Sequence, residues 1–135
     1  MALPRGIRNN NPCNIRLNGE KWIGEVFPST DTAFKQFISM AYGYRAVFVL
    51  LRNYQKKYGL NTIEQLIRRY APPMENSTEA YIKKVSEMSG ISRNEIVDTT
   101  SGEQMKKIVS AMSLVENGIR ADESEVNEGW RIFSS

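Results

Sequence analysis

The sequence predicts a mainly α-helical α+β domain with one small antiparallel sheet near its N-terminus. Two observations support this class. Beyond about Ser39, apolar residues recur at helical spacing between capping residues and glycines. Residues 14–37 instead alternate in polarity and contain Asn18-Gly19, a strong hairpin signal. Because 135 residues is the size of a domain with a single core, we expect one domain over residues 1–135.

The N-terminal third is predicted to be extended. Pro12 disfavours helix at the preceding residue, and the neighbouring asparagines favour turns. A sheet built from so few residues is too small to stand alone and should pack on helices. The expected elements are an extended segment over residues 1–13, a hairpin of residues 14–17 and 20–27, and a third strand over residues 32–37.

Capping signals divide the rest of the chain into helices. A Ser, Thr, Asn or Asp followed three residues later by Glu or Gln satisfies free N–H groups at a helix start, and Gly or Pro commonly follows the end. These signals predict helices from about Ser39 to Gly59, from Thr62 to Tyr70, from Asn76 to Gly90, a short one from Ser92, one from Gly102 to Asn117, and a last one from Asp122 that is weakened by Gly129.

Glu116 is the candidate catalytic residue. It follows Met112 by four residues and Val109 by seven, so its carboxylate falls within the buried stripe of the helix from Gly102 to Asn117. Desolvation and the partly negative helix end both disfavour the ionised form. A carboxyl held protonated near neutral pH is what a general acid for glycosidic cleavage needs. The alternative is an ordinary half-exposed or ion-paired glutamate.

The amino-acid composition limits which catalytic groups and which binding partners the protein can use. The chain has no His and only one cysteine, Cys13, which removes Ser-His and Cys-His nucleophiles, the usual zinc sites and an internal disulfide. We therefore expect carboxylate chemistry with no metal and no cofactor. Basic residues are spread along a chain of net charge +3, so we expect no nucleic-acid partner. No long apolar run or leader is present, so we expect neither membrane insertion nor a signal peptide.

Several separated segments resemble the lysozyme-like superfamily of peptidoglycan-cleaving enzymes, chiefly lytic transglycosylases and bacterial glucosaminidases. Residues 111–118, AMSLVENG, are similar to the helix end that carries the family's catalytic Glu. Residues 11–16, NPCNIR, resemble a substrate-lining stretch, and Trp22-Ile23-Gly24 resembles the Trp-x-Gly of the glucosaminidases. Residues 70–73, YAPP, followed by residues 75–85, are similar to the Tyr-Asn-Ala-Gly-Pro element of the transglycosylases. The chain also resembles small phage-encoded proteins that open with Arg-Gly-Ile-Arg-Asn-Asn-Asn-Pro-Gly-Asn-Ile.

The order of these segments differs from that of the superfamily. There the Glu helix precedes the Asn-rich stretch, whereas here Glu116 follows it by about a hundred residues. We infer a circular permutation, since domain termini commonly lie close together at the surface. Cys13 stands where the phage proteins usually have Gly, and a positive φ at this position would strain it.

The resemblance also implies substrate-binding residues, each with a structural alternative. That alternative is a turn cap for Asn14, core packing for Trp22 and Tyr70, local structure for Glu75 and plain solvation for Arg16. Arg45, like Arg16, is a candidate partner for muropeptide carboxylates, with plain solvation as its alternative. The implied substrate-binding residues are Asn11, Asn14, Arg16, Trp22, Tyr70 and Glu75.

The implied activity is cleavage of the β-1,4 bond between N-acetylmuramic acid and N-acetylglucosamine in a peptidoglycan glycan strand. Glu116 would protonate the leaving oxygen, and Glu20, Glu25 and Asp31 are the available second carboxylates. Without one of them, the acetamido or 6-hydroxyl group of the sugar would complete the reaction, as in a transglycosylase; we favour this single-Glu form. The alternative is a non-catalytic virion or wall-binding protein of the same fold.

The setting implied by the resemblance is a phage or prophage. We expect a monomer made in a bacterial cytoplasm that acts at the cell wall, either as an endolysin after release or as part of a virion.

Overall fold

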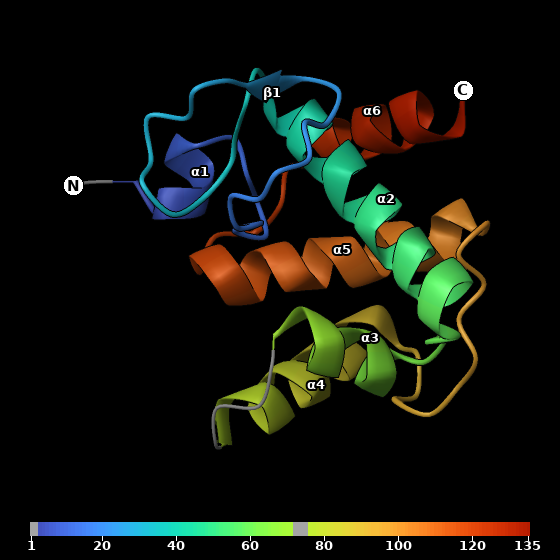
Figure 1. Cartoon of the computed structure of the whole chain (residues 1–135). Coiled ribbons are helices and arrows are strands. Elements are labelled where there is room, and N and C mark those ends of the chain that lie inside the picture. Colours follow the sequence, from blue (N-terminus) through green and yellow to red (C-terminus); the bar gives the residue numbers. More distant parts are fainter. Residues whose placement is uncertain (1–2, 72–75) are drawn as a thin grey trace.

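The computed structural model describes residues 3–71 and 76–135. In them the chain is mainly helical with a small antiparallel sheet near the N-terminus, as predicted, although the sheet has two strands where three were expected (Figure 1). The strands β1 and β2 pair with Glu25 opposite Phe37 and Val26 opposite Gln36. The elements are α1 (Arg5–Arg8), β1 (Glu25–Val26), β2 (Gln36–Phe37), α2 (Met40–Tyr58), α3 (Ile63–Tyr70), α4 (Asn76–Ser89), α5 (Gly102–Asn117) and α6 (Glu123–Ser134).

The predicted capping residues begin most of the long helices. The hydroxyl of Ser39 accepts a hydrogen bond from the N–H of Tyr42 at the start of α2, and Ser101 does the same for Gln104 at the start of α5. Each cap satisfies one of the N–H groups that the first helical turn leaves free. Gly118 ends α5 with a φ of 68°, a conformation that a residue with a Cβ rarely adopts. Local signals alone therefore set the position of the helix that carries Glu116.

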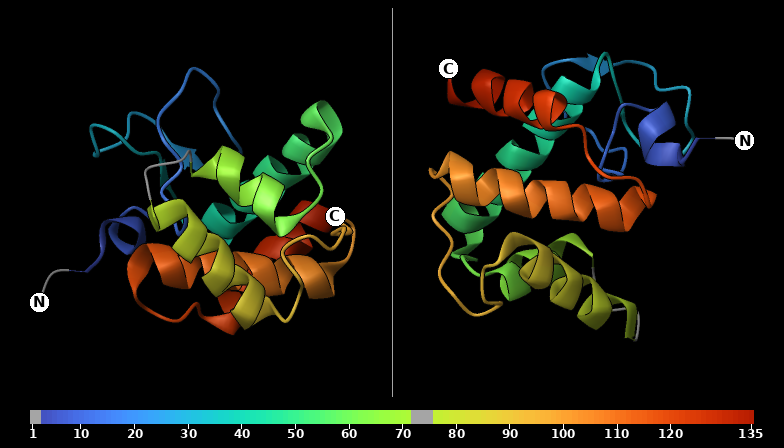
Figure 2. Two further views of the ribbon diagram at one scale, coloured as in Figure 1. Left: turned by 90° about the horizontal axis from the view of Figure 1, so that it is seen from below. Right: turned by 180° about the vertical axis from the view of Figure 1, so that it is seen from behind.

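Helix α5 lies in the middle of the molecule (Figure 1). The N-terminal segment with α1 lies on one side of it, and α3 and α4 lie on the other, an arrangement that the view from behind also shows (Figure 2). Its residues Met105, Ile108, Val109 and Met112 are fully buried, as the apolar stripe predicts. The N-terminal segment and helices α3 and α4 therefore flank α5 from opposite sides.

Helix α6 crosses α2, and Gly129 marks the place of closest approach. A Cβ at Gly129 would lie 2.8 Å from the carbonyl oxygen of Ala41 and 2.8 Å from Cβ of Tyr44. The expectation that this glycine merely weakens the helix is therefore incomplete, because the glycine is what allows the two backbones to approach. Trp130 then packs edge-on against Phe48, with ring centroids 5.0 Å apart.

The N-terminal third differs from its prediction in two ways. Residues 5–8 form the short helix α1 within the segment expected to be extended. The expected hairpin around Asn18-Gly19 does not pair; instead Arg16 bridges to Phe34, and β1 pairs with β2. The side chain of Asn18 accepts a hydrogen bond from the N–H of Glu20, a local turn that competes with hairpin geometry.

The short helix expected from Ser92 is also wrong. Residues 92–95 form a turn in which the N–H of Glu95 donates to the carbonyl of Ser92. The neighbouring backbone is used elsewhere, because the carbonyl of Arg93 accepts from Glu64 and the N–H of Val97 donates to Asn61. This extended connection ties the segment to the start of α3, and tertiary hydrogen bonds override the local capping signal.

Within residues 3–71 and 76–135, none of the helices is both long enough and apolar enough to cross a lipid bilayer.

Candidate functional site

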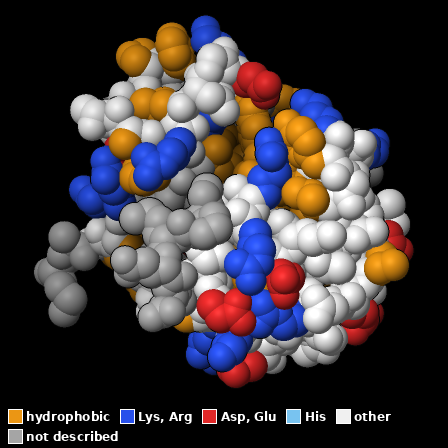
Figure 3. Space-filling model, turned by 60° about the horizontal axis from the view of Figure 1, so that its bottom comes forward, with side chains coloured by type: hydrophobic (Ala, Val, Ile, Leu, Met, Phe, Trp, Pro, Cys, Tyr) orange, Lys and Arg blue, Asp and Glu red, His pale blue; other side chains and the backbone are white. Residues whose placement is uncertain are grey.

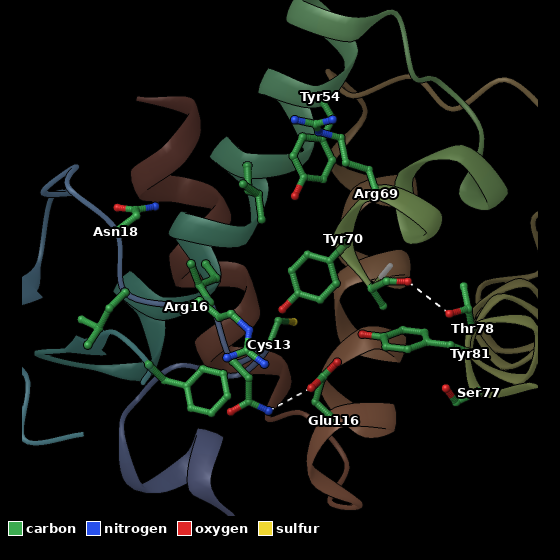
Figure 4. A pocket seen from close by; sticks show the side chains of 16 residues that line it. Cys13, Arg16, Asn18, Tyr54, Arg69, Tyr70, Ser77, Thr78, Tyr81 and Glu116 are labelled. Carbon is green, nitrogen blue, oxygen red and sulfur yellow. Dashed lines mark hydrogen bonds between the residues drawn. The ribbon is translucent and has the colours of Figure 1, made fainter. Parts of the chain in front are cut away.

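A cavity of about 570 Å³ opens between the loop of residues 13–18, the facing parts of α2 and α3, and the end of α5 (Figure 4). Its walls include the predicted residues Glu116, Asn14, Arg16 and Tyr70. The surface view shows hydrophobic and basic side chains gathered about a hollowed part of the protein (Figure 3). Segments 100 residues apart in the sequence thus contribute to one concave site, the usual form of a small-ligand site.

Glu116 is held by Asn14 across this cavity. The amide nitrogen of Asn14 donates a hydrogen bond to Oε1 of Glu116 at 2.8 Å (Figure 4). Residues 111–118 and 11–16, the two segments with the family resemblance, therefore meet at this contact. Asn14 has a φ of 54°, in the left-handed region, which asparagine tolerates better than most residues. The positive φ expected to strain Cys13 falls instead on its neighbour.

The loop that carries Asn14 is fastened to α5 by Asn117. The amide nitrogen of Asn117 donates to the carbonyl of Pro12 at 2.7 Å and to the carbonyl of Ser113 at 3.0 Å. One side chain therefore links the loop to the last turn of the helix, next to Glu116. The side-chain oxygens Oδ1 of Asn14 and Oδ1 of Asn117 are both buried without a hydrogen-bond donor among the described residues.

Asn11 organises the loop from inside and does not line the cavity. Its side chain is fully buried, donates to the carbonyls of Ile15 and Lys35 at 3.0 and 2.9 Å, and accepts from the N–H of Ile15 at 2.9 Å. The side-chain amide nitrogen and oxygen of Asn11 both make hydrogen bonds to backbone groups. We therefore replace the implied substrate-binding role of Asn11 with a structural one.

Tyr70 points into the cavity with a buried hydroxyl that has no hydrogen-bond partner among the described residues (Figure 4). Burial raises the pKa of this hydroxyl well above its ordinary value, and the nearby Cys13 and Glu116 raise it further. The group is therefore a neutral donor at physiological pH. Because a buried hydroxyl without a partner is unfavourable, its presence here indicates a site made for a ligand or an ordered water.

Two further groups beside Glu116 were not singled out from the sequence. Cys13 is buried on the cavity wall, and burial followed by the charge of Glu116 raises its thiol pKa well above the ordinary value. Tyr81 on α4 is buried and also lines the cavity, and burial is the main cause of its raised pKa. At neutral pH both groups are uncharged.

The candidate second carboxylates all lie elsewhere. Glu25 forms an ion pair with the buried Lys35, 2.9 Å from Oε1 to Nζ, and Asp31 forms a two-point ion pair with Arg5. Glu20 accepts from the indole of Trp22 and is exposed. Among the described residues that line the cavity, Glu116 is the only carboxylate. No group of three potential metal ligands occurs in the part of the chain that the structure describes.

Of the remaining predicted residues, Arg16 lines the cavity, and Trp22 and Arg45 do not. Trp22 is half-buried beside Lys35, outside the cavity lining, which corrects its predicted role as a sugar platform. Arg45 on α2 does not line the cavity either. Glu75 lies outside the described residues. Arg16 does line the cavity, and its guanidinium stacks on the ring of Phe34, 5.1 Å from the centroid.

Arg69 and Tyr54 complete the lining and were missed. Both come from helices whose sequence patterns predict only an amphipathic face, and Arg69 follows another arginine in an exposed last turn. No spacing rule separates Arg69 from Arg68, since tertiary packing alone brings one of them to the cavity. Cys13, by contrast, could have been suspected from its position next to Asn14.

The fold and the site define a class of mainly helical proteins with one carboxylate, held by an asparagine, in a partly apolar cavity. No family model matches the sequence. The chain is 43% identical over 117 residues to protein P5 of Pseudoalteromonas phage PM2, an alignment that covers 84% of this chain and 71% of that protein. At this identity and coverage the chain belongs to the family of that phage protein.

Proposed function

We propose that the protein cleaves the β-1,4 bond between N-acetylmuramic acid and N-acetylglucosamine in peptidoglycan, with Glu116 as general acid and base. The observation that supports this most directly is the position of Glu116. It lines a cavity of about 570 Å³ and receives a 2.8 Å hydrogen bond from Asn14. A cavity of this size falls in the ordinary range for small-ligand sites, about 300–1,000 Å³.

The proposed reaction uses one protein carboxylate. Glu116 donates its proton to the leaving glycosidic oxygen, and the acetamido or 6-hydroxyl group of the sugar attacks the anomeric carbon in place of a second carboxylate. Glu116 then accepts the proton of the attacking 6-hydroxyl or of the water that follows. Support comes from the cavity lining, in which Glu116 is the only carboxylate among the described residues.

Asn14 and Tyr70 have supporting roles in this proposal. The amide of Asn14 keeps the carboxyl of Glu116 in one orientation, so that its second oxygen faces the substrate. The hydroxyl of Tyr70 is buried, without a partner among the described residues and neutral at physiological pH, so it can donate to a sugar oxygen near the scissile bond. The family relationship with a phage protein supports action at a bacterial cell wall that a phage must cross.

Replacing Glu116 with Gln tests the proposal. The matched control is Glu103→Gln in the first turn of the same helix, where the side chain is 82% exposed and outside the cavity. We expect Glu116→Gln to abolish clearing of purified cell wall in a zymogram, and Glu103→Gln to keep it. Mass spectrometry of the digested wall should find anhydro ends on muramic acid if the sugar's own 6-hydroxyl completes the reaction.

Two results would contradict this proposal. Clearing that survives in Glu116→Gln would exclude the catalytic role of this residue. Wall binding without any released product from the wild-type protein would favour the alternative, a virion component that grips the wall without cleaving it.

A further inference from the structure

The cavity carries two arginines that no carboxylate of the described residues neutralises. Arg16 comes from the N-terminal loop and Arg69 from α3, and neither forms an ion pair with a described residue. Figure 4 shows Arg16 extending toward the Glu116 side of the cavity and Arg69 at its other end beside Tyr54, with Tyr70 between them. The cavity is therefore cationic at two separate points and acidic at one.

Aromatic stacking holds both guanidinium groups. Arg16 lies over Phe34, and Arg69 lies 3.7 Å from the ring centroid of Tyr58 and 5.4 Å from that of Tyr54. A stacked guanidinium keeps its N–H edge free while losing much of its freedom to move. Such a group is already ordered for two-point contact with a carboxylate.

The adjacent Arg68 shows what an arginine with a structural role looks like in this helix. It contacts Glu64 at 3.5 Å and Glu79 at 3.2 Å, and it does not line the cavity. Arg5 is likewise paired, with Asp31. Arg16 and Arg69 differ from these neighbours in the two properties that an anion site needs: neither has an ion-pair partner in the described part of the chain, and both line the cavity.

We propose that Arg16 and Arg69 are specificity residues that bind carboxylate groups on the glycan, so that the cavity selects an acidic glycan over a neutral one. This inference deepens the proposed function and depends on it for the identity of the polymer. In peptidoglycan the carboxylates come from two sources: the lactyl group of muramic acid, free once the peptide is removed, and the peptide stem itself. A chitin-type glycan of N-acetylglucosamine alone has neither.

The experiment measures binding of the full-length Glu116→Gln protein, which avoids turnover, to three soluble probes. These are intact uncrosslinked peptidoglycan strands, strands stripped of peptide by an amidase, and neutral chitooligosaccharides. We expect both acidic strands to bind more tightly than the neutral probe, with the preference falling as salt rises. Tighter binding of intact strands assigns the contacts to the peptide stem, and tighter binding of stripped strands assigns them to the lactyl group.

Arginine variants in that background locate the contacts. Arg69→Gln and Arg16→Gln should each weaken binding of acidic strands about threefold to tenfold and leave the neutral probe unchanged. The controls Arg68→Gln and Arg8→Gln remove the same charge outside the cavity and should change binding less than about twofold. Arg69→Lys keeps the positive charge but loses the planar guanidinium that can contact both carboxylate oxygens, so it should give an intermediate affinity. Thermal unfolding checks that each variant is folded.

The outcomes separate this inference from the proposed function. If the wild-type protein cleaves the wall but acidic and neutral probes bind equally, or the controls weaken binding as much as Arg69→Gln, the specificity role is wrong and the activity stands. If the wild-type protein releases no product but the arginine variants still lose acidic-strand binding, the activity is wrong and the anion site stands. Failure to bind any probe overturns the specificity role.

Discussion

Asn14 donates a hydrogen bond to Glu116, which lies 102 residues further along the chain, at a distance of 2.8 Å. Asn14 can do so because its backbone has a φ of 54° and because Asn117 ties the same loop to α5. The proposed acid is therefore oriented by a loop from the opposite end of the sequence. This contact and the groups around it lead to three predictions, and a separate ion-pair cluster leads to a fourth.

Replacing Asn14 should separate the role of its amide from the role of its backbone. Asn14→Gly removes the amide and keeps the left-handed conformation accessible, whereas Asn14→Ala removes the amide and strains the backbone by roughly 1–2 kcal/mol. We expect both variants to lose about tenfold in wall-cleaving rate, because both lose the contact that orients Glu116. Only Asn14→Ala should also show a clearly lower free energy of unfolding in urea. A fully active Asn14→Gly would show that the amide is dispensable.

Tyr70→Phe should affect activity and stability in opposite ways. The hydroxyl of Tyr70 is buried without a partner among the described residues, so removing it should leave the free energy of unfolding unchanged or raise it by about 1 kcal/mol. If the hydroxyl contacts the sugar, the cleavage rate should fall at least about tenfold. Rate measurements and urea unfolding on the same samples check both parts. Normal activity in the folded variant would make Tyr70 a packing residue only.

Gly6→Ala should loosen the loop that carries Asn14. A Cβ at Gly6 would lie 2.5 Å from Oδ1 of Asn117, 2.7 Å from the carbonyl of Asn11 and 3.2 Å from Oδ1 of Asn14. We expect a loss of about 1–3 kcal/mol in unfolding free energy, despite the better helix propensity of alanine. Gly19→Ala is the control, since nothing lies within 4 Å of a Cβ there, and it should change stability by less than about 0.5 kcal/mol. Equal effects of the two substitutions would be inconsistent with this packing.

The ion pairs of Arg93 should make stability depend on pH in the acid range. Hydrogen bonds from Arg93 lower the pKa of Glu79 from 4.5 to about 2. Because the folded pKa lies below the unfolded one, the stabilisation is complete above pH 4.5 and is lost as the pH falls through about 2. The difference in melting temperature between the wild-type protein and Arg93→Gln should therefore shrink over this range. For Lys56→Gln, an exposed charge without an ion pair among the described residues, we expect a small difference without this acid transition.

The five longer helices, α2 to α6, followed from local sequence, whereas α1 and the strand pairing did not. The starts of α3, α5 and α6 each use a capping side chain of their own, such as Ser101 for α5, so no distant residue was needed to place them. The hairpin around Asn18-Gly19 does not form. Both residues are exposed, and the side chain of Asn18 accepts from the N–H of Glu20 in a local turn instead. Strand pairing went instead to residues 25–26 and 36–37, a choice that depends on contacts between segments.

Only part of the candidate site could be predicted from the sequence. Glu116 could be named because it lies on a helix stripe that is readable locally, whereas Asn14 was named from the resemblance of residues 11–16 to a substrate-lining stretch, with a turn cap as the alternative. The sequence could not distinguish Asn11 from Asn14. The structure shows that Asn11 bonds within its own loop and that Asn14 faces the cavity. Arg69 was missed because its difference from Arg68 is one of orientation.

By itself, the sequence determined the extent of α5 and the stripe that ends at Glu116, and its lack of histidine pointed to a carboxylate as the proposed catalytic group. Only the tertiary structure decided that Asn14 meets Glu116, that Glu20, Glu25 and Asp31 lie outside the cavity, and that Arg69 lines it. The physical reason is that caps and helical periodicity act within a few residues. A cavity, by contrast, is formed by the packing of segments that have no fixed relation in sequence.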